Sequence, residues 1–372
     1  MVVLGYQSTE AFFCILSGTD GFVYRMFLGL NKGYSYLAPF YWRHKYEGRV
    51  TNHLMFPLYS SITRSAPRQP IGGEFAFNGT MLVRFTNPES WTKSWRDFGI
   101  DAAMSVTAAT SGDFIGQLHL PRKINYVGDD ARRQIGDMFV QEGRSLFKCL
   151  IDMLDSTPFW AESEVTMAPV VETEAVHNTN LKVELSENAE IIATLHSFLS
   201  LYMSLAFQNN SETISGDGLS DGIKGTFKEF KGNGLCSVLV WNKPKEMPRD
   251  QQAKVIDQLQ SIKSKFFLNS DEWAQIVFRC FKEFQVKRSD NELQASQTVI
   301  RGVLLCVFYL RVLSFNIETS GLPTYPDAEE LVMGQMKVSS HTALAYLKDK
   351  NNDREKVANG TLAKSVQISL SS

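Results

Sequence analysis

The pattern of apolar and polar positions changes character about a third of the way along the chain. Up to residue 128 the apolar runs are short and are separated by turn residues and six prolines, as is typical of strands. The sharpest local signal is Asn78-Gly79 between the strand-like runs Glu74–Phe77 and Thr80–Phe85. Both turn residues tolerate positive φ, so this arrangement predicts a type I′ hairpin. The other predicted strands are Phe22–Leu28, Tyr34–Tyr46, Leu54–Tyr59 and Phe114–Leu120.

From Asp129 onward the apolar positions recur at helical spacing. Three start signals support helices in this part: Pro248 at a first helical position, Ser270 as a cap, and the capping box Ser289–Glu292. The predicted helices are 130–154, 186–207, a short one near 222–230, one after 248, one after 270, 289–315, 327–337 and 340–348, with one further strand at Leu235–Trp241. Residues 351–372 are polar and poor in aromatic side chains, which predicts a flexible tail.

These patterns predict an α+β protein with a strand-rich N-terminal third, a mainly α-helical body and a polar C-terminal tail. The corresponding domains are a strand-rich, basic domain of residues 1–128, a mainly helical domain of residues 129–350, and the tail of residues 351–372. A chain of 372 residues is long enough for two domains. Its hydrophobic content of 44% supports a sizeable core and excludes a wholly disordered protein.

Cysteine usage and apolar segments bear on where the protein resides. The five cysteines are far apart in apolar surroundings, which favours free, buried thiols in a reducing compartment. Met1–Ser17 lacks the basic start of a secretory signal. Ile191–Phe207 and Val299–Phe315 contain polar residues or arginines that favour core helices over membrane spans. We therefore expect a cytoplasmic protein with no membrane span.

No catalytic or metal-binding motif stands out in the sequence. Asp217–Gly222 has the spacing of a calcium loop, but Leu219 and Lys228 stand where oxygen ligands belong. The six histidines are dispersed, and we predict neither a bound metal nor a cofactor. Because a catalytic set can assemble from distant residues, an enzyme with a dispersed active site between the two domains remains an alternative.

The charge distribution is more informative than the net charge of −2. Residues 21–96 contain ten Lys and Arg against three Glu, a balance of +7. Residues 155–190 contain eight Asp and Glu against a single Lys, a balance of −7. The small net charge is therefore no argument against a polyanionic partner.

The basic segment also carries aromatic side chains, most densely in Tyr41–Arg49. Cations follow the phosphates of single-stranded nucleic acid while rings stack on its bases, so the combination indicates a single-stranded RNA interface. An ordinary half-buried strand with a polar outer face has the same pattern and is the competing interpretation. The candidate nucleic-acid-binding residues are Arg43, Lys45, Arg49, Arg64, Arg68, Arg84, Lys93, Arg96, Trp42 and Tyr46.

Three functions follow as hypotheses. The first is a non-enzymatic, self-assembling structural protein associated with RNA, of the viral nucleocapsid or coat type, and hence located in the virion if the protein is viral. Opposed charges on one chain favour head-to-tail association of copies, although the two segments can equally pair within one chain. The second is the enzyme described above. The third is a protein-only scaffold or coat subunit, in which the basic segment meets the acidic one and touches no nucleic acid.

Overall fold

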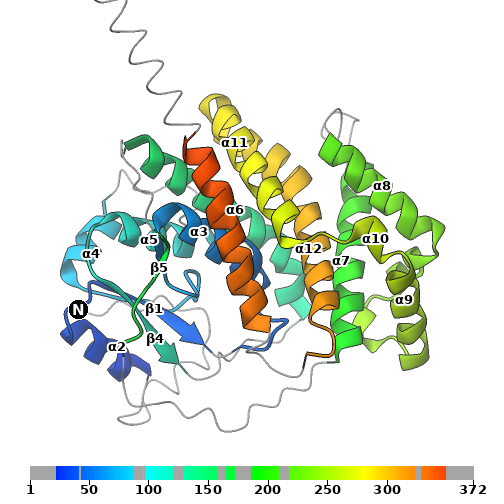
Figure 1. The fold of residues 1–372 in the computed structure, drawn as a ribbon, viewed down its shortest axis with the longest axis horizontal. Coiled ribbons are helices and arrows are strands. Elements are labelled where there is room, and N and C mark those ends of the chain that lie inside the picture. The colour runs from blue at the N-terminus through cyan, green and yellow to red at the C-terminus, as the bar shows by residue number, and fades with distance from the viewer. Residues whose placement is uncertain are drawn as a thin grey trace, which may run out of the picture.

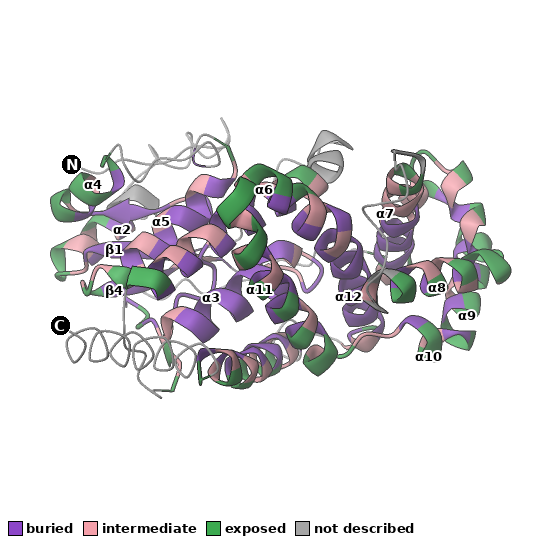
Figure 2. Cartoon of the chain, turned by 90° about the horizontal axis from the view of Figure 1, so that it is seen from above, coloured by how far each residue is buried: buried purple, intermediate pink, exposed green. Residues whose placement is uncertain are grey.

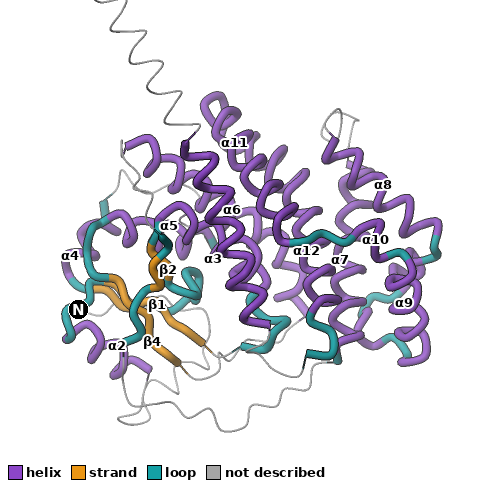
Figure 3. The backbone as a smooth tube through the Cα atoms, viewed as in Figure 1, coloured by secondary structure: helices purple, strands orange, loops and turns teal. Residues whose placement is uncertain are grey.

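The computed structural model describes residues 22–41, 43–87, 95, 97–120, 129–156, 164–171, 186–208, 218–322 and 328–348. Helices account for 74% of these residues, and the few strands are short. Figure 3 shows the strands gathered at one end of the molecule, with helices across the rest. The chain thus combines helices with a small β component, but the predicted strand-rich N-terminal third is wrong.

The main sheet has three strands in the order β3-β1-β4. Strand β1 (Tyr36–Tyr41) pairs in parallel with β4 (Ile115–Leu120) and antiparallel with β3 (Ala76–Phe77). Helices α2 (Phe22–Asn31), α4 (Gly79–Phe85) and α5 (Gly99–Thr110) surround this sheet (Figure 1). A second, two-stranded parallel sheet joins β2 (Ser65–Ala66) to β5 (Thr166–Met167). The predicted strand Phe114–Leu120 is confirmed over Ile115–Leu120, and the predicted strand Tyr34–Tyr46 only over Tyr36–Tyr41.

The predicted hairpin at Asn78-Gly79 is replaced by a helix start. The Asn78 side chain accepts a hydrogen bond from the backbone N–H of Met81 at 3.0 Å, so it caps α4. Asparagine is as suitable for a helix N-cap as for a turn, and sequence alone did not separate the two. The predicted strand Phe22–Leu28 lies in α2, and Leu54–Tyr59 spans the end of the π-helix η1 (Thr51–Met55) and α3 (Phe56–Thr63). Short, continuous apolar runs suit buried helices and strands alike.

The centre of the molecule is a group of long helices around the largest apolar cluster. These are α6 (Asp129–Ser156), α11 (Ser270–Ala295), the π-helix η6 (Ser296–Leu304) and α12 (Leu305–Glu318). The cluster takes in Val50, Leu54, Leu58 and Ile62 as well as residues of all these helices, so one core contains side chains from both sides of residue 128. The division into domains stays a prediction.

Two helix starts in this region shift by one or two residues from the predicted caps. Asn269, not Ser270, caps α11, in a capping box with Glu272. Near the predicted box at Ser289–Glu292, α11 has a kink at Asn291, whose side chain accepts a hydrogen bond from the N–H of Gln294 at 3.0 Å. Asn291 thus caps the segment that continues into η6.

Helix α7 (Glu187–Gln208) connects the centre to the far end of the molecule. There α8 (Gly218–Gly232), η4 (Leu235–Val240), η5 (Pro244–Glu246), α9 (Arg249–Ser261) and α10 (Lys263–Phe266) form a group of short helices, which we call the helical module. The strand predicted at Leu235–Trp241 is wrong. Leu235 and Val238 are the buried residues of η4, and their spacing of three suits a helical turn, whereas a strand would bury alternate positions.

The last described element is one helix of residues 328–348, which we call the cover helix. It merges the predicted helices 327–337 and 340–348 and is the orange-red helix of Figure 1. The Ser340 hydroxyl donates to the carbonyl oxygen of Met336 at 3.1 Å, so this polar residue is accommodated within the helix. The predicted tail of residues 351–372 lies outside the described residues.

Two described helical stretches are long and apolar enough to cross a membrane, Glu187–Ala206 and Lys263–Glu318. Within the second, 89% of the most apolar window is buried inside the fold, and within the first 44% is buried. High burial of this kind is typical of core helices (purple in Figure 2). The absence of a membrane span stays a prediction.

Candidate nucleic-acid interface

Seven of the ten predicted RNA-binding residues lie in described parts of the chain, and Trp42, Lys93 and Arg96 lie outside them. Arg43, Lys45, Tyr46 and Arg49 belong to the turn between β1 and η1. Arg64 ends α3, Arg68 follows β2, and Arg84 lies on α4. Of the first four, Arg43 lies near enough to Arg68 for their charges to interact, whereas Arg84 is paired with Asp113.

Lys45 is buried, and its ammonium group has three hydrogen-bond acceptors. Its ammonium group donates to the Glu187 carboxylate at 2.5 Å, at the start of α7. It also donates to the carbonyl oxygens of Thr319 and Leu322 at 2.7 and 2.9 Å, just beyond the end of α12. Lys45 therefore joins the basic segment to both helices.

Arg49 makes the next contact along α7. Its guanidinium donates to Glu190 at 2.5 Å, and Glu190 is also paired with Lys245 of the helical module. The Glu190 side chain is only 6% exposed, so a single buried carboxylate serves two cations.

Arg68 has the most complete set of partners. Its guanidinium contacts both oxygens of Glu329 on the cover helix, with Nη2 to Oε2 at 2.8 Å, and donates to Asn52 Oδ1 at 2.8 Å. It lies over the ring of Phe56, 4.8 Å from the ring centroid. A guanidinium group interacts most favourably when it donates two hydrogen bonds to one carboxylate and stacks on an aromatic ring.

These three partly buried ion pairs form what we call the charged junction: Lys45 with Glu187, Arg49 with Glu190, and Arg68 with Glu329. Two of its carboxylates belong to the acidic segment of residues 155–190. The opposed charges noted in the sequence are thus paired within one chain. Burial alone would raise the pKa of Glu187, but hydrogen bonds from Lys45 and from the N–H of Gly321 outweigh it and lower that pKa. The Glu187 carboxylate is consequently ionised at neutral pH, where it can pair with Lys45.

The other predicted residues differ from one another. Tyr46 is buried, with Lys45 Nζ 5.1 Å from its ring centroid. Arg64 has a φ of 60° and joins α3 to β5, because its carbonyl oxygen accepts from the N–H of Thr166 at 3.0 Å. Arg84 is exposed and lies 3.7 Å from Asp113. Among the predicted residues that the structure describes, Arg84 therefore has the cationic group that is most accessible to solvent.

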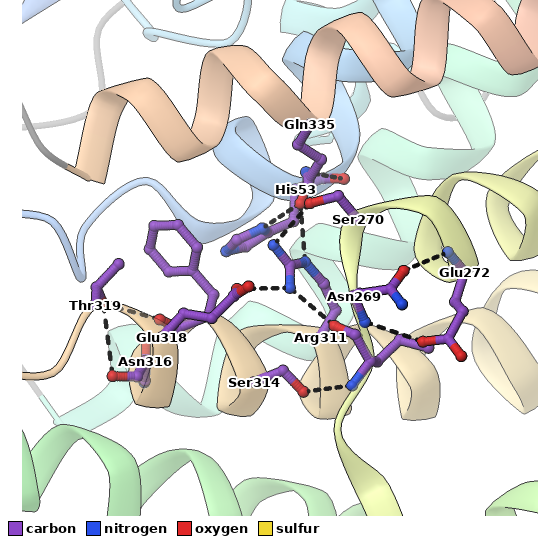
Figure 4. A network of polar contacts seen from close by, with 12 residues as sticks. His53, Asn269, Ser270, Glu272, Arg311, Ser314, Asn316, Glu318, Thr319 and Gln335 are labelled. Atoms are coloured by element: carbon purple, nitrogen blue, oxygen red, sulfur yellow. Dashed lines mark hydrogen bonds and ion pairs between the residues drawn. The ribbon is translucent and has the colours of Figure 1, made fainter. Parts of the chain in front are cut away.

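A second buried polar network lies beside the junction (Figure 4). Arg311 of α12 is 1% exposed and donates to Gln335 Oε1 at 2.9 Å, to the Leu268 carbonyl oxygen at 2.8 Å, and to Glu318 at 3.0 Å. Gln335, on the cover helix, donates in turn to the carbonyl oxygen of Asn52 at 3.0 Å. Arg68 and Arg311 are both buried, and each thus has an acceptor on the cover helix.

His53 lies within this network, with Nδ1 3.4 Å from Gln335 Oε1 and its ring edge-on to Phe315. Burial, and after it the charge of Arg311, lower the pKa of His53 well below the ordinary value. The imidazole is therefore neutral at pH 7. Within the described ranges, no group of three or more His, Cys, Asp or Glu side chains has the arrangement of a metal site.

A cationic surface that the sequence analysis did not select lies on α8. Lys224, Lys228 and Lys231 are four and three residues apart, so they form one stripe along the helix, on a different side from the buried Ile223 and Phe230. Lys228 and Lys231 are exposed, and Lys224 is 3.7 Å from Asp221 at one end of the stripe. Residues 218–266 contain nine Lys and Arg against five Asp and Glu, a balance of +4.

An aromatic pair flanks this stripe. Phe227 of α8 stacks on Tyr202 of α7, with ring centroids 4.1 Å apart and an interplanar angle of 17°. Both side chains are half-buried, so each ring is partly accessible to solvent. The helical spacing of Lys224, Lys228 and Lys231 was visible in the sequence, but the neighbouring ring of Tyr202 lies on another helix and only the fold brings it there. We call the three lysines and two rings the α8 surface.

Comparison of the sequence with models of known protein families and with functionally characterised proteins found no match.

Proposed function

We propose that the chain is a non-enzymatic structural protein that binds single-stranded RNA and assembles with copies of itself, in the manner of a nucleocapsid or coat protein. The observation that carries the proposal is the α8 surface, where three lysines in one stripe adjoin two stacked, half-buried rings. Lysines attract and follow phosphates, and accessible rings stack on bases without sequence preference. The partner is single-stranded RNA, as the sequence predicts, but its principal contact is the α8 surface in the helical module and not residues 43–68.

Exposed apolar side chains support the assembly part of the proposal. Val83 on α4 and Phe114 beside β4 are 72% and 78% exposed, and Val240 in η4 is 79% exposed. Figures 1 and 2 place α4 and the helical module at opposite ends of the molecule. Different surfaces at opposite ends suit head-to-tail contacts, which build rings or filaments.

The direct test measures binding of a fluorescein-labelled oligouridine to the full chain by anisotropy over a range of salt concentrations. The triple variant Lys224→Gln/Lys228→Gln/Lys231→Gln should bind more weakly, and its slope of log K against log salt should fall by about 2, from about 0.7 for each lost phosphate contact. Lys282→Gln/Lys287→Gln/Lys337→Gln is the matched control, because it removes three other exposed lysines.

Equal losses in the two triple variants would contradict the assignment to α8. A wild-type chain with no RNA affinity at low salt would contradict RNA binding altogether. Size-exclusion chromatography with the ratio of absorbance at about 260 and 280 nm, before and after ribonuclease, reports assembly and bound RNA together; ribonuclease-sensitive oligomers are the expected result.

The protein-only scaffold is the second candidate, and the charged junction favours it. Lys45, Arg49 and Arg68 are buried against carboxylates of the same chain, so their charges are already satisfied. Oligomers that are free of RNA and resist ribonuclease would support this candidate over the first. No arrangement of titratable groups in the described ranges favours the enzyme, which stays an untested alternative.

A further inference from the structure

Arg64 is the one predicted cation, among those that the structure describes, without a carboxylate beside it. Burial is the only cause that lowers the pKa of its guanidinium. Burial also lowers the pKa of Arg43 and of Arg311, but there nearby carboxylates act against the change. Carboxylate partners are present as well for the other predicted cations, Lys45, Arg49, Arg68 and Arg84. The charge of Arg64 is therefore uncompensated within the described part of the chain.

One edge of the Arg64 guanidinium carries donors without acceptors. Its Nε and Nη2 are both buried, and neither has a hydrogen-bond partner within the described ranges. Arg68 uses the same two atoms to contact both oxygens of the Glu329 carboxylate. Buried donors without an acceptor are rare in native proteins, because they have lost their hydrogen bonds to water. The edge that binds an oxyanion in Arg68 is thus the edge that is unpaired in Arg64.

The backbone of Arg64 is held in a conformation that does not favour arginine. With a φ of 60° and a ψ of 3°, it is the only non-glycine residue with positive φ in the described ranges. Its N–H donates to the carbonyl oxygen of Ser60 at 3.0 Å, and its own carbonyl oxygen accepts from Thr166 N–H at 3.0 Å. Glycine adopts this conformation without a clash of Cβ. The arginine therefore adds backbone strain to the cost of its unpaired donors, and strain of this kind is characteristic of functional sites.

The position of Arg64 suits a small anion. The residue as a whole is half-buried, so its guanidinium is not sealed inside the core. It connects α3 to β2, and Figure 3 shows β2 well apart from α8. A site at Arg64 is consequently distinct from the α8 surface.

We infer that Arg64 binds one phosphate group through the edge formed by its Nε and Nη2. Free phosphate and the phosphates of an RNA backbone present the same pair of oxygens to the arginine fork. The RNA source rests on the proposed function, whereas binding of free phosphate does not. A bound phosphate supplies an acceptor to each of the two donors and compensates the buried charge.

The first test measures the melting temperature of the full chain in inorganic phosphate and in sodium chloride of equal ionic strength. A ligand of the folded state raises the melting temperature, so wild type should melt about 2 °C higher in excess phosphate. Arg64→Gly should show no such rise. Lys282→Gln is the control, because it removes an exposed cation of α11 and should respond to phosphate as wild type does.

Arg64→Gly has a second expected property. Without phosphate it should melt higher than wild type, because glycine suits the positive φ and the unpaired cation is gone. Loss of an arginine with only a structural role would lower the melting temperature instead. If Arg64→Gly does not fold, Arg64→Lys decides the question: it keeps the charge but lacks the fork, so its response to phosphate should be smaller than that of wild type.

The second test identifies the source of the phosphate with the oligouridine anisotropy assay. If the phosphate belongs to RNA, Arg64→Gly should lower the slope of log K against log salt by about 0.7, the value for one phosphate contact. If the ligand is free phosphate, the slope should equal that of wild type while the response of the melting temperature is lost.

The possible failures are distinguishable. If phosphate acts equally on wild type and Arg64→Gly and the RNA slope is unchanged, the Arg64 site is refuted while the α8 surface stands. If wild type responds to phosphate through Arg64 but binds no RNA, the proposed function fails and the Arg64 site stands. If acetate raises the melting temperature as much as phosphate does, the ligand is a carboxylate and the assignment to phosphate is overturned.

Discussion

Two regions of this chain carry a positive balance and use it in opposite ways. Around residues 43–68 the cations Lys45, Arg49 and Arg68 are buried against carboxylates from distant parts of the chain. In the helical module, Lys228 and Lys231 are exposed and hold no ion pair within the described ranges. Arginine dominates the first region and lysine the second, in line with the fork of the guanidinium and the strong hydration of the ammonium group.

The difference shows that charge density along a sequence does not identify a binding surface by itself. The denser of the two segments is the one that the fold uses internally. The sparser one is arranged along a single face of α8 and remains available to a partner. Substitutions that treat the two regions alike should therefore give very different results.

The largest expected effect is on stability in the charged junction. Arg68→Ala leaves the Glu329 carboxylate and Asn52 without their partner and should lower the free energy of unfolding by about 3–5 kcal/mol. Lys228→Ala, the matched change on α8, should alter it by less than about 0.5 kcal/mol. Urea unfolding of both variants gives the comparison. Equal, small effects would mean that the junction contributes no more than a surface contact.

The next effect is a pH dependence that arises beside the junction, at His53. The buried His53 has a lowered pKa, so the unfolded chain binds a proton more readily than the folded one, and the stability it contributes above about pH 6.5 is lost as the pH falls. Stability should therefore fall as the pH drops below about 6.5. His53→Gln should remove this part of the dependence in urea unfolding at several pH values, and an unchanged slope would rule out His53 as its source. The helical module contains no histidine and contributes nothing to it.

A smaller effect separates binding from packing within α8. Phe227→Leu keeps an apolar side chain but removes the aromatic ring that stacks on Tyr202, and should weaken RNA binding by about 1 kcal/mol, or about fivefold. Phe230→Leu is the control, because Phe230 is fully buried and its change should lower stability without a specific effect on RNA. Anisotropy titrations that show the same RNA loss in both variants would argue against a stacking role for Phe227.

The smallest effect concerns two glycines, Gly225 in the helical module and Gly72, which follows the first region by four residues. Gly225 lies in α8, where a methyl group on its Cα would have no heavy atom within 4 Å, so Gly225→Ala should raise stability by about 0.5–1 kcal/mol. At Gly72, beside the sheet, the same methyl group would lie 2.0 Å from Pro39 Cγ, so Gly72→Ala should lower stability. Thermal melts of both variants test the pair, and the same sign of change in both would contradict it.

Helices with regular apolar spacing were predictable from the sequence. The predictions for 130–154 and 186–207 match α6 and α7 within two residues at each end, because a long amphipathic pattern has few other solutions. The strand predictions failed where the signal was short. Asn78 suits a turn and a helix cap equally, and only the packing of Met81 and Phe85 of α4 beside Tyr36 of β1 decided between them.

The candidate site was predictable only in part. The sequence indicated that opposed charges exist, but the partners in the junction are 142, 141 and 261 residues apart, and no local pattern records such pairings. The lysine spacing on α8 was readable from the sequence, whereas the stacking of Phe227 on Tyr202 depends on how α7 and α8 pack.

The distance along the chain between junction partners has a consequence for protein synthesis. Glu329 follows Arg68 by 261 residues and Gln335 follows Asn52 by 283, so ribosomes at about 5–20 residues per second need tens of seconds to supply them. Glu187 and Glu190 follow their partners by 142 and 141 residues, so Lys45 and Arg49 lack their carboxylates for about half of that interval and Arg68 lacks Glu329 for all of it. A nascent chain therefore presents to its surroundings the cationic, aromatic segment that the finished protein conceals, and translation of the cover helix ends that exposure.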